Sequence, residues 1–158
     1  MPDYRTVTIP ERGEHILLCR LRGISTGFLN GFGGNQEPQD KTLEDTSKRG
    51  TWEQSGGKLG ILGVGIQVLV QEEIGVMLFK FTHKTGEHEV HFYKATRWRG
   101  RVHETDEMVP HWFLKSEPPL DGMFPGDRLW FPLYQQGKYF NGWVLYDERF
   151  AIVNREIK

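Results

Sequence analysis

The sequence has little cysteine, almost no net charge and no long apolar run. Cys19 is the only cysteine among 158 residues, so neither an intramolecular disulfide nor a CxxC metal site can form. Lys and Arg number 20 against 21 for Asp and Glu, a net charge of -1. This balance excludes a protein that binds bulk nucleic acid or a membrane surface mainly through its overall charge. No apolar run approaches the ~18 residues that a membrane-spanning helix needs.

The residues that are present favour one folded domain. Hydrophobic residues make up 37% of the chain, with ten Phe and five Trp, which is enough apolar surface for a core. Because a domain usually has ~100–200 residues, we expect a single domain spanning residues 1–158, and we expect a monomer. The first residues lack the basic segment and apolar stretch of a signal peptide, so we expect a cytoplasmic location.

Local patterns predict several strands around one main helix. Clustered β-branched and apolar residues predict strands at 7–10, 15–21, 59–70, 74–82, 87–96 and 141–147. Residues 83–86 are typical of a hairpin turn between two of these strands. Residues 42–55 predict a helix, with Thr42 as its N-cap and Gly56-Gly57 as its stop. A shorter helix is predicted over 129–136.

The segment 27–34 (GFLNGFGG) holds four glycines in eight residues. Glycine is favoured where the backbone adopts conformations closed to other residues or approaches another group closely. This segment therefore predicts a functional loop. Asn30, in its middle, has two interpretations, because asparagine beside glycine is common in turns and also supplies a polar contact to a ligand.

A resemblance to a known family rests on three segments and their order. Gly33-Gly34, Thr42-Leu43-Glu44-Asp45 and the run 48–56 (KRGTWEQSG) resemble the Nudix box, G-x5-E-x7-R-E-U-x-E-E-x-G-U, in which U is apolar. Outside the box, the chain resembles the MutT-homologue phosphatases that remove oxidised purine nucleoside triphosphates. Segments that follow this subgroup in order are 30–34, 79–81, 104–108, Pro110, 112–113, 123–125, Asp127 and 130–133. The resemblance implies the Nudix fold, an α+β (α/β/α) sandwich in which helices flank a mixed β-sheet.

In this family the box helix carries the carboxylates that hold magnesium. Such an ion takes one or two protein carboxylates together with substrate phosphates, so the acids must project from one helix face, as i and i+4 residues do. The three positions are here Gly50, Glu53 and Gln54, so Glu53 alone keeps its carboxylate. The resemblance implies Glu53, Glu107 and the backbone of Gly33 as metal ligands, with Mg²⁺ or Mn²⁺ as cofactor if the protein is active.

Arg49 matches the box arginine and is, with Glu53, the expected catalytic residue. Spacing alone allows another interpretation, because Asp45, Arg49 and Glu53 lie four residues apart and could form a salt-bridge ladder on a helix surface. The upstream box glutamate falls on Asp40 when counted from the glycines and on Lys41 when counted back from Arg49. One residue has therefore been inserted between the two ends of the box.

The residues that the resemblance assigns to the purine site are better kept than the box helix. Asn30 is expected to hydrogen-bond the purine edge, and Asp127 is the remaining member of an acidic pair whose other position is Gly126. The aromatic lining and the further substrate contacts are expected from Phe79, Phe81, Phe124, Trp112 and Arg20. The i, i+2 spacing of the first two aromatics also fits ordinary packing on one face of a strand.

Two functional hypotheses follow from these residues. In the first, the chain keeps a purine nucleotide pocket, while magnesium-dependent hydrolysis is lost or impaired because Gly50 and Gln54 replace glutamates. In the second, it is an active hydrolase that converts a nucleoside triphosphate to monophosphate and pyrophosphate, with Glu53, Glu107 and either Asp40 or Glu44 at the metal. Residues 59–67, which the subgroup lacks, have no assigned role.

Overall fold

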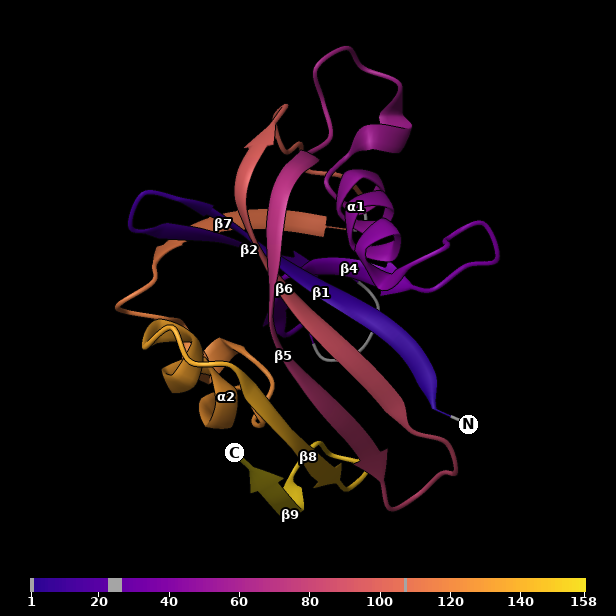
Figure 1. Ribbon diagram of the computed structural model, residues 1–158, viewed down its shortest axis with the longest axis vertical. Coiled ribbons are helices and arrows are strands. Elements are labelled where there is room, and N and C mark those ends of the chain that lie inside the picture. The colour runs from indigo at the N-terminus through magenta and orange to yellow at the C-terminus, as the bar shows by residue number, and fades with distance from the viewer. Residues whose placement is uncertain (1, 23–26, 107) are drawn as a thin grey trace.

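The computed structural model describes residues 2–22, 27–106 and 108–158 of the chain (Figure 1). The strands are β1 (Asp3–Arg12), β2 (His15–Leu21), β3 (Leu29–Asn30), β4 (Phe32–Asn35), β5 (Gln67–Phe81), β6 (His88–Arg99), β7 (Met108–Leu114), β8 (Phe140–Tyr146) and β9 (Ile152–Ile157). The α-helices are α1 (Leu43–Gln54) and α2 (Asp127–Gln135), and single 3-10 turns are η1 (Gly57–Leu59) and η2 (Leu120–Gly122).

The strands form one mixed sheet. Its order is β3-β2-β1-β6-β5-β8-β9, with β4 paired to β1 and β7 paired to β2. The β1–β6 and β5–β8 pairs are parallel and the other pairs are antiparallel. Figure 1 shows α1 beside β4 and α2 beside β8, at different parts of the sheet. The predicted α+β fold, a mixed sheet flanked by helices, is confirmed.

Alternation along β2 explains how the sheet is covered on both faces. Successive side chains of a strand point to opposite faces. Ile16 and Leu18 accordingly pack in the larger apolar cluster with Trp130 of α2, whereas Leu17 and Cys19 pack in a second cluster. The continuous apolar run of β2 thus reflects burial on both faces, as expected of an interior strand.

Capping sets the start of α1 where the sequence predicts it. The Thr42 hydroxyl accepts a hydrogen bond from the Asp45 N–H at 3.1 Å, and the Asp45 carboxylate accepts from the Thr42 N–H at 3.3 Å. This reciprocal pair is a capping box. Helix 42–55 is therefore confirmed, and the capping role of Asp45 removes it from the alternative salt-bridge ladder with Arg49.

The hairpin predicted around residues 83–86 is confirmed, since β5 and β6 pair across it. The strand predicted over 59–70 is wrong for residues 59–66, because β5 begins only at Gln67. Gly60, Gly63 and Gly65 have positive φ, which a strand does not allow, and they carry the chain through turns. The predicted loop 27–34 is partly extended instead, since β3 lies within it and β4 begins in it, at Phe32. No helix in the described ranges combines the length and apolar character needed to span a bilayer.

Candidate functional site

A cavity of about 400 Å³ opens between the β1–β4 and β5–β6 strand pairs and the start of α2. Five of the residues expected at the purine site by resemblance line it: Asn30, Phe79, Phe81, Phe124 and Asp127. The structure therefore brings together five residues that lie far apart in the sequence. The volume of the cavity falls in the range of ordinary small-molecule pockets, ≈ 300–1,000 Å³.

Aromatic rings form one wall of this cavity. The Phe79 ring stacks on the Tyr146 ring with centroids 5.9 Å apart and planes 11° apart. Phe124 contacts Phe28 at 4.6 Å and Phe150 at 5.4 Å between centroids. Phe150 is held at φ 61°, an unusual conformation for a residue with a bulky side chain. A planar, apolar ligand such as an aromatic base fits this wall, because flat rings stack favourably on aromatic side chains.

Asp127, the first residue of α2, is the most buried acid of the cavity. Its residue is 3% exposed, and its two oxygens accept hydrogen bonds from the Trp130 indole N–H at 2.8 Å and from the Phe124 backbone N–H at 3.1 Å. Burial raises the pKa of Asp127 to about 7, although both hydrogen bonds favour the ionised form. The carboxyl group can therefore either accept or donate a hydrogen bond near neutral pH.

Asn30 lies at the end of β3 with its side chain at the cavity. Its amide oxygen accepts a hydrogen bond from the Gly31 backbone N–H at 2.9 Å. This contact leaves the NH₂ group, with two donors, for a ligand. The two interpretations of Asn30 are thus compatible, because one end of the amide holds the local backbone while the other lies at the cavity.

Arg20 and Trp112 are not among the residues that line the cavity in the described part of the chain. The Arg20 guanidinium donates to the Gly27 carbonyl at 2.6 Å. Trp112 stacks on Trp98 with centroids 6.1 Å apart, and the Arg12 guanidinium lies 5.0 Å from its ring. The structure gives both residues contacts elsewhere, so it does not bring them to the expected substrate.

Several cavity residues were missed by sequence reasoning. They include Phe28, Phe92, Tyr146 and Phe150 among the aromatics, and Arg5, Lys84 and His88 among the basic residues. The basic group comes from β1, the β5–β6 turn and β6, which become neighbours only because β1 and β6 pair in parallel. No local spacing signals that contact. Phe28 had a detectable signal, since it lies in the glycine-rich segment.

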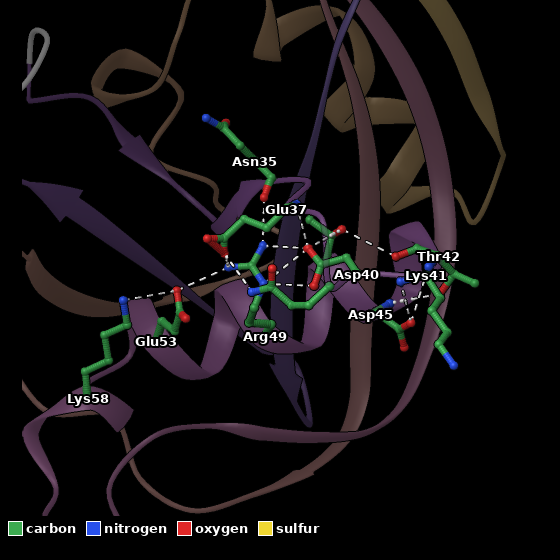
Figure 2. Close-up of polar contacts among 11 residues, drawn as sticks. Asn35, Glu37, Asp40, Lys41, Thr42, Asp45, Arg49, Glu53 and Lys58 are labelled. Atoms are coloured by element: carbon green, nitrogen blue, oxygen red, sulfur yellow. Dashed lines mark hydrogen bonds and ion pairs between the residues drawn. The ribbon is translucent and has the colours of Figure 1, made fainter.

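Arg49 is held by acids on three sides, as Figure 2 shows. Its guanidinium donates to Asp40 at 2.7 Å, and lies 2.6 Å from Glu37 and 3.2 Å from Glu53. It also donates to the Asn35 carbonyl at 2.7 Å. The hydrogen bond from Arg49 holds the pKa of Asp40 down, at about 2. Asp40, and not Lys41, therefore pairs with the box arginine, and the inserted residue is absorbed before the helix begins.

Gly50 packs directly on the backbone of the glycine segment. A Cβ at position 50 would lie 2.9 Å from the Gly33 carbonyl carbon and 3.0 Å from both the Gly33 oxygen and the Gly34 nitrogen. The side chain of Gln54 also faces this backbone, because its Oε1 accepts a hydrogen bond from the Gly33 N–H at 2.9 Å. Both positions that carry glutamates in the Nudix box thus hold α1 against β4.

The described residues of the box do not fit a magnesium site. Gly50 supplies no ligand atom, Gln54 Oε1 is bound to Gly33, and the Glu53 carboxylate lies 3.2 Å from Arg49 and 3.6 Å from Lys58. Within residues 2–22, 27–106 and 108–158, no group of three or more His, Cys, Asp or Glu side chains could hold a metal ion. Glu107, the other expected ligand, lies outside the described residues.

Comparison with known proteins finds relatives that match nearly the whole chain. No protein-family model matches the chain. A zebrafish (Danio rerio) protein named oxidized purine nucleoside triphosphate hydrolase is 32% identical over 151 residues, covering 96% of this chain and 90% of its own. A mouse (Mus musculus) protein of the same name is 29% identical over 155 residues, covering 98% and 93%.

Solved structures give the same result at the level of the fold. The mutator MutT protein of Bacillus halodurans superposes with a TM-score of 0.79 at 24% identity, over 99% of this chain and 97% of that protein. The match to the zebrafish protein extends over nearly the whole of both chains. The chain shares the fold of the MutT and NUDIX hydrolase structures, and by its match to the zebrafish protein it belongs to the family of oxidised purine nucleoside triphosphate hydrolases.

Proposed function

We propose that this chain binds a purine nucleotide in the cavity and hydrolyses it weakly or not at all. The observation that supports this most directly is the α1–β4 contact. Position 50 has no room for a side chain, and Gln54 is used to hold the Gly33 N–H. Losing one preorganised charge-stabilising group typically costs ~10²–10³ in rate, and the chain lacks two of the three box glutamates. Such losses are not additive, but even one is severe.

The shape and charge of the cavity support the nucleotide as ligand. The aromatic wall suits the base, and Asn30 and Asp127 supply polar contacts for its edge. Arg5 and Lys84 line the same cavity and favour an anionic group, whereas burial lowers the pKa of His88, which is therefore mostly neutral near pH 7. The relatives in zebrafish and mouse are named for oxidised purine nucleoside triphosphates, so the ligand class proposed is a purine nucleotide with an oxidised base. A cytoplasmic location and a monomeric state stay predictions.

A pyrophosphate-release assay tests the proposal. The purified protein should release no pyrophosphate from dGTP, 8-oxo-dGTP or 2-hydroxy-dATP with Mg²⁺ or Mn²⁺, while at least one of them raises its melting temperature, because a ligand bound only to the folded state stabilises it. The zebrafish relative is the positive control. Turnover close to that control would overturn the loss of hydrolysis, and no thermal shift with any nucleotide would overturn the binding function.

The second candidate is an active hydrolase that forms a nucleoside monophosphate and pyrophosphate. The relatives' name favours it. It requires Glu53 to leave Arg49 and Lys58 when substrate binds, and it requires a further acid from Glu107, Asp40 or Glu44. Both Asp40 oxygens accept from Arg49, at 2.9 and 2.7 Å, so Asp40 would have to leave this arginine before it could bind a metal ion.

A further inference from the structure

The hydroxyl of Tyr146 occupies the space beside Gly126, the residue that precedes α2. The Gly126 backbone N–H donates a hydrogen bond to the Tyr146 hydroxyl oxygen at 2.8 Å. A Cβ added at position 126 would collide with that oxygen and would lie 3.3 Å from a methyl group of Val144. A glycine is therefore required at 126 by the tyrosine at 146, and the two residues form one structural unit.

Tyr146 is fixed in this position by its surroundings. The residue is 2% exposed, and its ring packs between Phe79, at 5.9 Å, and Phe150, at 5.5 Å between centroids. It also lines the cavity. Burial raises the pKa of the Tyr146 hydroxyl, which consequently keeps its proton at neutral pH. The cavity thus presents a rigid, neutral hydroxyl beside the carboxyl group of Asp127.

The direction of the Gly126 hydrogen bond decides what this hydroxyl can offer. A phenol has one proton and two lone pairs, whereas an ionised carboxylate only accepts. The Gly126 N–H occupies a lone pair, and the hydroxyl proton has no protein acceptor among the residues that the structure describes. Tyr146 therefore offers a donor at the place where an acidic side chain at position 126 would offer an acceptor.

We propose, on the basis of the function proposed above, that Tyr146 is a specificity-determining residue whose hydroxyl donates a hydrogen bond to a carbonyl oxygen on the base. The neighbouring ring N–H of such a base then donates to the Asp127 carboxylate. A carbonyl next to an N–H is the edge of an oxopurine. The pair of Tyr146 and Asp127 selects oxopurine nucleotides over aminopurine nucleotides, because an amino group opposite the hydroxyl leaves the hydroxyl proton without an acceptor.

Calorimetric binding of dGTP, 8-oxo-dGTP and dATP to Tyr146→Phe tests the role of the hydroxyl. The native protein should bind the two oxopurines more tightly than dATP. The variant should lose about tenfold in affinity for the oxopurines, the loss expected for one hydrogen bond, with little change for dATP. Tyr134→Phe is the matched control. Its hydroxyl is also buried and donates to Glu11 at 2.5 Å, but it does not line the cavity, so the preference should persist.

A second pair of variants separates recognition from packing. Gly126→Asp alone should lower the melting temperature, because its side chain meets the Tyr146 hydroxyl, whereas Gly126→Asp combined with Tyr146→Phe should recover much of that loss. The double variant should not regain the oxopurine preference. An unchanged oxopurine preference in Tyr146→Phe would overturn the proposal while leaving nucleotide binding intact. Failure of the native protein to bind any of the three nucleotides would instead overturn the proposed function, and this proposal with it.

Discussion

The side-chain oxygen of Gln54 accepts a hydrogen bond from the backbone N–H of Gly33 at 2.9 Å. This contact ties the last residue of α1 to the glycine segment, in the part of the box helix where the family carries a metal-binding glutamate. Together with the close packing of Gly50 on the same backbone, it gives this face of α1 a structural role.

Gly50→Ala tests the packing of α1 on β4. Helix propensity alone predicts that alanine stabilises the protein by ~1 kcal/mol relative to glycine. The contact with the Gly33–Gly34 backbone predicts the opposite, a net destabilisation of about 1–3 kcal/mol, as for other overpacked sites. Urea denaturation measures the difference. Gln54→Glu is the comparison variant, and it should fold normally because a carboxylate also accepts from the Gly33 N–H.

If the two missing glutamates were the only defect, Gly50→Glu combined with Gln54→Glu would restore hydrolysis. In the structure, a side chain at position 50 would meet the Gly33–Gly34 backbone. We therefore expect the Gly50→Glu protein to be less stable than the Gly50→Ala protein. A Gly50→Glu protein as stable as the native one would show that α1 is free to move away from β4.

Asp40→Asn tests the buried pair with Arg49. The pKa of Asp40 is lowered to about 2 from 3.8, so its ion pair stabilises the folded state above pH 4 and is lost as the pH falls toward 2. The shift corresponds to about 2 kcal/mol. The stability difference between native protein and variant should therefore be constant at pH 5–7 and shrink below pH 4. Asp121→Asn is the control, because the Asp121 side chain is 99% exposed, and a similar pH dependence there would contradict the assignment.

Asp127 gives the opposite pH dependence. Its pKa is raised from 3.8 to about 7, so between these pH values the folded protein holds a proton that the unfolded chain has released. The free energy of unfolding should then fall as the pH rises through this window, by about 1.4 kcal/mol per pH unit. Asp127→Asn should remove this slope. Chemical denaturation at pH 4.5, 5.5, 6.5 and 7.5 measures it, and equal slopes in both proteins would show that Asp127 does not titrate there.

Lys84→Ala tests the anionic end of the ligand. Lys84 lines the cavity and lies 4.3 Å from the Phe81 ring, so its removal should weaken nucleoside triphosphate binding several-fold and leave nucleoside binding unchanged. Lys80→Ala is the matched control, since the Lys80 ammonium lies over Trp143, at 5.1 Å, and the residue does not line the cavity. Equal effects of the two variants would place the phosphates elsewhere.

The sequence predicts those parts of the fold that depend on local signals. The capping residues Thr42 and Asp45 indicate the start of α1. The 83–86 turn joins the two longest strands, β5 and β6, as expected. β7 was missed because Pro110 interrupts its pattern. β7 pairs only with β2, and proline is tolerated on such an edge strand.

Contacts between distant segments decide the parts that could not be predicted. The fit of the Tyr146 hydroxyl against Gly126, and that of Gly50 against Gly33, depend on how β8, α2, α1 and β4 meet. In each case the glycine is needed because an atom from a distant segment fills the space that a side chain would take. The sequence around the glycine does not indicate which atom this is.

A crystal structure of the protein with 8-oxo-dGTP and Mn²⁺ tests the central claim most directly. The account predicts the base in the cavity beside Phe79 and Tyr146, the triphosphate intact, and no manganese ion coordinated by Glu53. A manganese ion bound to Glu53, or a monophosphate in place of the triphosphate, would contradict it.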